Sequence, residues 1–360
     1  MNTVHRGLIP ALLVFLPASA LAAPQFYGRI DIALEGTDDY PSRTLASALD
    51  DMDEGDSPLR DGWFVEAYNS YLGVRDEVPL DVGGLSLIYQ FEAGYDVDGS
   101  SSRTFSTRNS YIGLATPWGR VFAGRYDSLV KQAEGKLDQF NNTAADMQTV
   151  FTSQYRNSNT LNWVSPNLGN LVLKAQLAPG EQDELGTPPY DETKDGLADI
   201  YALSATWNSD ALYAALAYEH GYTERALPAP VSLNVPADRD VLRGALGMRV
   251  GNLSLGAIVE ELRLDPDYPG ASRLDGTSYL LSAGLAMSPR LTLKAQGGRF
   301  DSDDLGYTLT TGTVGADYKL GAQTTAYTLL SVSDADVDDD AAGYDDGKGG
   351  LVSVGLAHKF

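Results

Sequence analysis

The chain has 360 residues, 49 of them acidic and 26 basic, so its formal net charge is -23 at pH 7. This balance disfavours a nucleic-acid partner, because phosphate binding needs a basic surface. The chain has no cysteine, which excludes disulfides and thiolate metal sites.

The first 22 residues have the pattern of a secretory signal peptide. One Arg and no acid precede a mostly apolar stretch, and Ala20-Leu21-Ala22 provides a small-x-small cleavage site. We expect cleavage after Ala22, which leaves residues 23–360 with 25 basic and 49 acidic side chains, since Arg6 is removed. The alternative is an N-terminal membrane anchor, but the apolar stretch is shorter than the ~20 residues that a spanning helix needs.

Beyond residue 23, the dominant signal is an alternation of apolar and polar residues with a period of two. No uncharged apolar run approaches the length of a spanning helix, and mean hydropathy is -0.20. Strands of ~9–11 residues can cross a membrane with such a composition, because lipid-facing and lumen-facing positions alternate. The expected strands are 25–36, 62–76, 84–95, 105–116, 119–126, 156–165, 170–178, 197–207, 211–221, 239–250, 252–264, 277–288, 290–300, 306–319, 322–333 and 350–360.

These sixteen segments favour a closed antiparallel barrel with both termini on the periplasmic side. In the first segment, Ile30 and Leu34 lie on one face, and Arg29, Asp31 and Glu35 lie on the other. A soluble β-sandwich would show the same alternation, so the pattern alone does not say which face is inside. The signal peptide, the even number of strands and the small, simple side chains on the apolar faces favour the transmembrane barrel.

The connections alternate between short turns and long loops, which is also typical of an outer-membrane barrel. Short connections such as 116–118, 166–169 and 208–210 read as periplasmic turns. Long ones include 37–61, 127–155, 179–196 and 334–349. The last strand ends on an aromatic residue, Phe360.

Several motifs give the mature chain a resemblance to a known family. They are Tyr27-Gly-Arg-Ile-Asp31, Ser70-Tyr-Leu-Gly-Val-Arg75, Arg108-Asn-Ser-Tyr-Ile-Gly-Leu114, Trp118-Gly-Arg-Val-Phe-Ala-Gly-Arg125, Tyr155-Arg-Asn-Ser-Asn159, Trp163-Val-Ser-Pro166 and Phe360. In this order and spacing they resemble the general porins of Gram-negative bacteria. The resemblance implies a 16-stranded barrel in the outer membrane, a homotrimer, and a third extracellular loop that folds into the lumen, here residues 127–155.

The resemblance also implies a constriction with acids on that loop facing arginines on the barrel wall. The acidic side is expected among Asp127, Glu134, Asp138 and Asp146. The basic side is expected among Arg29, Arg75, Arg108, Arg125 and Arg156. Strand parity supports inward positions for Arg29 and Arg75, but Arg108 shares the parity of Ile112 and Leu114 and stays ambiguous. An alternative interpretation gives these charges only a structural role, as salt bridges that anchor the loop.

Two departures from the family pattern stand out. The loop carries Leu137-Asp-Gln-Phe-Asn-Asn142 where related loops often have Pro-Glu-Phe-Gly-Gly, so the resemblance does not predict the conformation of its tip. His358 occupies a position in the last strand that is usually aromatic.

No cofactor is expected, apart from weak binding of Ca²⁺ or Mg²⁺ at Asp336, Asp338 and Asp340. Ala341 and Gly347 replace the Gly and Glu of a calcium loop, which excludes an EF-hand. A solvated, repelling acidic loop is the simpler alternative. An enzyme is not expected, because only His220 and His358 remain after signal removal and neither has convincing catalytic partners.

The sequence therefore predicts an outer-membrane channel for passive diffusion of small hydrophilic solutes and ions, with membrane lipid and lipopolysaccharide as neighbours. The negative net charge predicts cation preference at low salt. Two alternatives remain: a substrate-specific pore with a saturable site among Arg29, Tyr71 and Arg75, and a non-conducting structural or adhesin barrel.

Overall fold

The computed structural model describes residues 23–40, 60–99, 105–181, 183–185, 192–225, 234–266, 272–338 and 347–360. The signal peptide proposed for residues 1–22 lies outside this part of the chain and stays a prediction. No helix among the described residues is long and apolar enough to cross a membrane.

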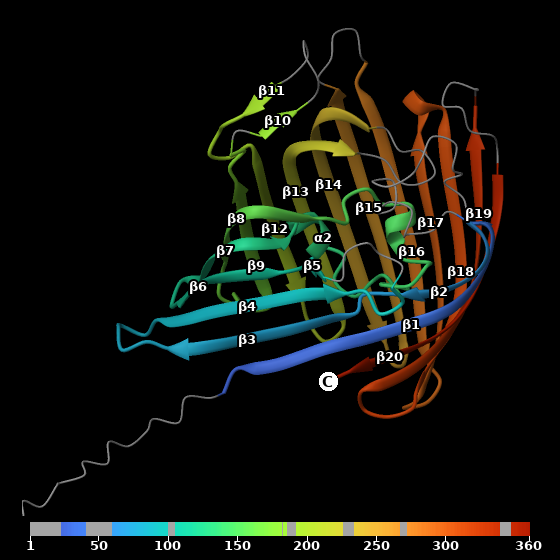
Figure 1. Cartoon of the computed structure of the whole chain (residues 1–360), viewed down its shortest axis with the longest axis horizontal. Coiled ribbons are helices and arrows are strands. Elements are labelled where there is room, and N and C mark those ends of the chain that lie inside the picture. The colour runs from blue at the N-terminus through green and yellow to red at the C-terminus, as the bar shows by residue number, and fades with distance from the viewer. Residues whose placement is uncertain are drawn as a thin grey trace, which may run out of the picture.

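The chain forms one large antiparallel sheet and a small two-stranded one (Figure 1). The large sheet contains β1 (Gln25–Tyr40), β2 (Arg60–Ala67), β3 (Tyr71–Pro79), β4 (Ser86–Tyr95), β5 (Phe105–Thr107), β6 (Ser110–Thr116), β7 (Gly119–Asp127), β8 (Arg156–Val164), β9 (Leu171–Ala178), β12 (Ile200–Asn208), β13 (Leu212–Arg225), β14 (Asn234–Val250), β15 (Leu253–Pro266), β16 (Leu274–Ala286), β17 (Leu291–Ser302), β18 (Tyr307–Lys319), β19 (Thr324–Val337) and β20 (Gly347–Lys359). The small sheet pairs β10 (Asp183–Leu185) with β11 (Glu192–Lys194).

The large sheet closes on itself, because the first strand pairs with the last. Ile30 lies opposite His358, and Leu34 lies opposite Val354. Two crossings are each built from two pieces, β2 with β3 and β5 with β6, since β1 pairs with both of the former and β4 with both of the latter. The 18 strands of the sheet therefore make sixteen crossings, which confirms the predicted 16-stranded barrel.

The interruptions are the main difference from the expected strands. The predicted segment 62–76 breaks at residues 68–70, where Asn69 adopts a positive φ of 44°. Ser70 connects this break to β1, because its hydroxyl accepts a hydrogen bond from the Asp31 amide over 3.0 Å. The segment 105–116 breaks at residues 108–109. The predicted loop 179–196 also contains the β10–β11 hairpin, which the period-two pattern did not reveal.

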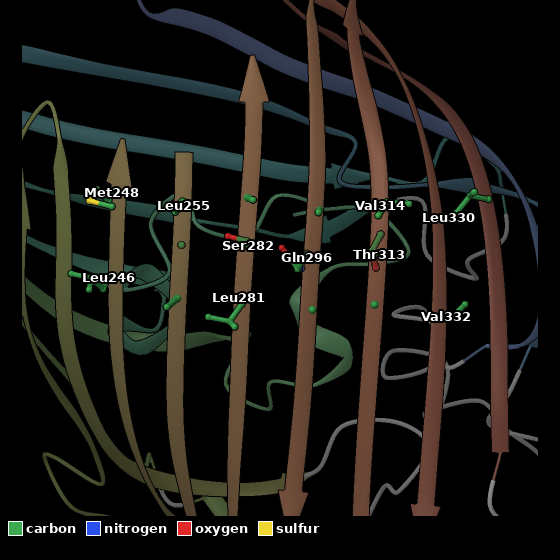
Figure 2. A pocket seen from close by; sticks show the side chains of 16 residues that line it. Leu246, Met248, Leu255, Leu281, Ser282, Gln296, Thr313, Val314, Leu330 and Val332 are labelled. Atoms are coloured by element: carbon green, nitrogen blue, oxygen red, sulfur yellow. The ribbon is translucent and has the colours of Figure 1, made fainter. Parts of the chain in front are cut away.

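The two faces of the barrel wall differ as the alternation predicts. Ile30 and Leu34 on β1 are 46% and 50% exposed on the outside, whereas Asp31 and Glu35 are buried on the inside. On the strands from β14 to β19, Leu246, Leu281, Leu330 and Val332 belong to the outer, apolar set (Figure 2). A charged side chain is tolerated on the inner, aqueous face but is costly on the lipid face.

A substitution at Ile30 tests which face of the barrel wall is the outer, apolar one. Ile30→Arg is expected to destabilise the folded barrel by ~2–4 kcal/mol, because the new charge lies in the apolar band. The control is Asp38→Arg, on the same face of β1 but at its far end, where little loss is expected. Equilibrium unfolding in phospholipid vesicles measures both variants, and equal stability of the two would contradict the assigned orientation.

Candidate pore constriction

A loop of residues 128–155, called the inserted loop below, connects β7 with β8 and contains α2 (Leu129–Gln132) and the 3-10 turn η1 (Met147–Thr149). Side chains cap both turns, since Ser128 accepts from the Lys131 amide and Asp146 accepts from the Gln148 amide. Many of its side chains are fully buried, including Val130, Phe140 and Phe151. The loop therefore has a packed, fixed shape.

Hydrogen bonds from the inner face of β16 and β17 hold the backbone of the inserted loop. Ser282 and Ser278 on β16 donate to the carbonyl oxygens of Leu137 and Val150, each over 2.6 Å. The side-chain oxygen of Gln296 on β17 accepts from the Gln139 amide over 2.9 Å. These partners lie on the lumen side of the wall, so the loop lies inside the barrel, where Figure 1 shows α2.

Glycines on the same wall leave room for the loop side chains. A Cβ at Gly247 would lie 2.5 Å from Leu137, one at Gly298 would lie 2.7 Å from Val150, and one at Gly315 would lie 2.7 Å from Phe140. Any other residue at these positions would displace the loop. Phe140 belongs to the Leu137–Asn142 segment that departs from the family pattern, and it packs below Lys294, whose Nζ is 4.7 Å from the ring centroid.

Two buried ion pairs join neighbouring strands of the wall next to the inserted loop. Arg243 on β14 pairs with Glu260 on β15, and neither side chain is exposed. Arg243 also donates to the Val130 carbonyl over 3.0 Å and lies 5.1 Å from the Phe151 ring centroid. Arg239 pairs with Glu219 at 2.9 Å. Removing one member of such a pair leaves the other charge buried without compensation, so these residues anchor the loop strongly.

Asp127 is the one loop acid that contacts a predicted wall arginine in the described part of the chain. Its Oδ1 lies 3.1 Å from Arg156 Nε and 3.0 Å from Lys131 Nζ. Its Oδ2 accepts from Asn109 over 2.6 Å. Asp127 therefore links the start of the inserted loop to the basic wall.

The other three acids are buried within the loop. Asp138 accepts from the backbone amides of Phe140 and Met147 over 2.8 and 3.0 Å. Asp146 accepts from the Asn142 amide over 2.6 Å. Glu134 accepts from the Asn141 side chain over 3.0 Å. These contacts give all three acids a structural task in shaping the loop, and their part in a transverse field stays a prediction.

Burial and the nearby negative charge of Asp146 raise the pKa of Glu134 from its usual 4.5 to about 7. The folded loop therefore holds this proton more tightly than the unfolded chain does, so its stabilising effect is complete below pH 4.5 and declines as the pH rises to about 7. We expect Glu134→Gln to flatten this decline in the unfolding midpoint measured in detergent. Glu261→Gln, on the exposed outer face, is the control, and an unchanged pH profile in the Glu134 variant would contradict the assignment.

The predicted basic residues on the first strands point into the lumen. Arg29 on β1 pairs with the buried Asp31. Arg75 on β3 donates to the Gln25 side chain over 3.0 Å and lies 4.7 Å from the Tyr27 ring centroid. Among the described residues, Arg75 has no acidic partner within ion-pair distance.

Arg108 also faces inward, which strand parity left undecided. It lies at the break between β5 and β6, and this break resets the alternation, so Ile112 stays outside while Arg108 turns in. Its Nε is 3.5 Å from Glu92, and its guanidinium lies 4.8 Å from the Tyr71 ring centroid. Glu92 additionally accepts from the Tyr27 hydroxyl over 2.8 Å.

Arg156 continues the basic wall on β8, whereas Arg125 on β7 lies between Gly124 and Tyr126, and Tyr126 packs against the inward Tyr111. Arg125 lies at a bulge in the pairing of these strands, and it donates to the Ser158 hydroxyl over 2.5 Å. Arg156 shares Asp127 with Lys131, as described above. Four arginines, Arg29, Arg75, Arg108 and Arg156, are called the arginine wall below, and a place for Arg125 at the constriction stays a prediction.

The two sides of the constriction thus differ in charge. Three of the arginines, Arg29, Arg108 and Arg156, have a carboxylate partner, and Arg75 does not have one among the described residues. The partly exposed positions of the inserted loop include the neutral side chains Gln139, Asn141, Asn142 and Gln148 and the exposed Lys136.

A comparison with known protein families decides which family the chain belongs to. The family model described as Gram-negative porin matches residues 11–340. The chain belongs to the Gram-negative porins. Membership confirms the predicted outer-membrane location and the expectation that the chain is not an enzyme.

Individual relatives agree with the family. The porin is 25% identical over 231 residues to the major outer membrane protein P.IA of Neisseria meningitidis serogroup B, covering 61% of this chain and 59% of the relative. The chain thus spans about three fifths of the length of that curated relative.

Two solved structures share the fold of this porin. An anion-selective porin from Comamonas acidovorans superposes with a TM-score of 0.69 at 17% identity, covering 94% of this chain and 99% of that one. OmpT of Vibrio cholerae in its trimer form gives a TM-score of 0.63 at 13% identity, with 94% and 99% coverage.

The site predicted from the sequence omitted several residues that contribute to the site in the structure of this porin. Glu92 was not singled out, although it lies within the arginine wall. Arg120, which pairs with Glu77 at 2.7 Å, was also omitted. The anchors Arg243 and Glu260 were missed because an inward charge on a distant strand looks like any lumen residue. A usable signal was the run of inward glycines on β14 to β18, which indicates that something packs closely against that wall.

The remaining sequence candidates do not form a second site in the described residues. His220 contacts Asp240 at 3.0 Å on the outside of β13, in a group with Tyr218 and Tyr201. No group of three or more potential metal ligands occurs among the described residues. Asp336 and Asp338 are exposed, Asp340 lies outside the described residues, and cation binding there stays a prediction.

Proposed function

We propose that this porin is a passive diffusion channel for small hydrophilic solutes and ions. The proposal is supported mainly by the closed barrel, which has polar side chains inside and a packed loop in its lumen. Passage then follows the concentration gradient, and charged side chains along the path order the water that an apolar solute would have to displace.

We infer that the constriction favours anions, opposite to the preference that the net charge predicts. Selectivity is decided where the path is narrowest, and there the loop acids Glu134, Asp138 and Asp146 are buried while Arg75 keeps uncompensated charge among the described residues. The dispersed negative charge lies on exposed surfaces, where salt screens it within ~8–10 Å. Asp127 then serves as the acidic member of the constriction.

Single-channel recording of the refolded mature protein tests the channel proposal. Stepwise ohmic currents in KCl, together with vesicle swelling in small neutral sugars, are the expected result. Protein that inserts into the bilayer without conducting would favour the structural or adhesin alternative.

We propose a homotrimer, in which the outer faces of the first strands meet. These faces carry large exposed apolar side chains, among them Phe26, Trp63 and Phe91. Cross-linking in mild detergent should give a trimer that resolves into monomers on boiling, and a monomer throughout would contradict it.

The opposite wall, from β14 to β19, then faces lipid. A groove on its outer face is lined by small residues such as Ala283, Ala295 and Gly297 between larger ones such as Leu281 and Val314 (Figure 2). We propose that membrane lipid, including the acyl chains of lipopolysaccharide, packs into it, and that acids such as Asp336 bind divalent cations weakly at the outer surface.

A further inference from the structure

We propose that a cavity below the inserted loop, near the periplasmic mouth, binds a small organic anion with one carboxylate and an apolar body. The cavity has a volume of about 450 Å³. It would act as a second, saturable site in series with the arginine wall, so it extends the proposed channel function and rests on it.

The cavity lies between the tip of the inserted loop and the short-turn ends of β12 to β15. Lys136 and Leu137 form one side. The opposite side includes Tyr213 and Gly247, which are directly paired across β13 and β14. The glycine leaves space here, because a Cβ at this position would meet Leu137 at 2.5 Å. The cavity is therefore enclosed by a loop and a wall that are both held in place.

Two cations border this space. Lys136 is exposed on the loop, and Arg249 lies two residues beyond Gly247 on the same inner face of β14. In the described part of the chain, neither side chain has an acid within ion-pair distance. The Arg249 amide is held by the Ala211 carbonyl over 2.9 Å, which fixes the backbone but leaves the guanidinium available.

The remaining lining limits the ligand to a single negative charge. Asp210 also borders the cavity. The two cations and this one acid give the lining of the cavity a formal net charge of +1. A dianion would be repelled by this carboxylate more than a monoanion. A carboxylate can accept charge-assisted hydrogen bonds from both Lys136 and Arg249. Leu137 and Leu255 offer an apolar surface beside it, which suits an aromatic or aliphatic acid.

Benzoate is a suitable probe, and inorganic phosphate is the comparison. We expect benzoate to reduce the KCl current saturably, at lower concentration from the periplasmic side than from the extracellular side. Lys136→Gln and Arg249→Gln should each raise the half-blocking concentration, and the double variant should raise it by about tenfold or more. Lys136→Arg should keep the block. Arg290→Gln, which removes a cation from a neighbouring turn outside the cavity, is the charge-matched control.

Calorimetric titration of the folded protein in detergent separates this inference from the channel function, because binding heat needs no current. Benzoate heat that disappears in the double variant supports the site even if the protein does not conduct. Normal conduction with neither benzoate heat nor block overturns the site and leaves the channel intact. Equal binding in the double variant, or tighter binding of phosphate than of benzoate, also overturns it.

Discussion

Replacing Arg243 with methionine is expected to release the inserted loop from the barrel wall. The substitution keeps the side-chain volume but leaves Glu260 buried without its partner, and the donor to the Val130 carbonyl is lost. Breaking a buried pair in this way costs about 3–5 kcal/mol. We expect a lower denaturant midpoint in detergent, together with larger and noisier single-channel currents, because a displaced loop no longer narrows the lumen.

The double variant Arg243→Met, Glu260→Gln is the matched control. It removes the stranded charge while keeping an acceptor, so it should recover part of the stability lost in the single variant. Arg249→Met changes the same residue type on the same strand outside the buried pair and should leave the midpoint nearly unchanged. A single Arg243 variant with wild-type stability and quiet currents would show that this pair does not anchor the loop.

Neutralising the arginine wall should lower the proposed preference for anions. In the double variant Arg75→Gln, Arg108→Gln, two charges that face the lumen are lost, whereas Glu92 keeps its negative charge. A unit charge acting over 4 Å in water is worth about 1 kcal/mol, so each substitution weakens both the attraction of chloride and the repulsion of potassium by about that amount. The chloride-to-potassium permeability ratio should then fall by up to roughly thirtyfold. Reversal potentials in a KCl gradient at low salt measure this ratio.

Arg273→Gln provides the charge-matched control, because Arg273 lies exposed beside Asp275, away from the arginine wall. Its reversal potential should stay close to that of the wild type. Glu92→Gln should move the potential in the opposite direction to the arginine variants, because it removes the acid next to Arg108. A wall variant that keeps the wild-type ratio would remove these residues from the selectivity mechanism.

Much of the fold followed from local rules. The alternation of apolar and polar residues in segments such as 25–36 follows from the two environments of a barrel wall, the apolar outside and the aqueous lumen. The even number of strands follows because the barrel closes with both termini on one side. The breaks at Asn69 and Arg108 were harder to predict, because a strand interruption depends on tertiary partners such as the contact between Ser70 and Asp31. The break at Arg108 also explains why strand parity left its orientation ambiguous.

The constriction was less predictable than the barrel. The sequence placed Arg29 and Arg75 on the lumen side of their strands, because a charge on the lipid face is costly within the apolar band of the barrel. It could not show that Asp138 and Asp146 turn back to cap their own loop, since the folded path of a 28-residue connection depends on contacts such as the one between Phe140 and Gly315. The acidic residues therefore indicated that the loop carries charge, but not whether their side chains point into the lumen or back into the loop.

The reversal potential of the wild-type channel in a KCl gradient at low salt is the most direct test of this account. Under the proposed anion preference, which rests on the arginine wall, chloride should be more permeant than potassium, and the difference should shrink as salt shortens the screening length. A potential of the opposite sign, with potassium the more permeant ion, would contradict the account.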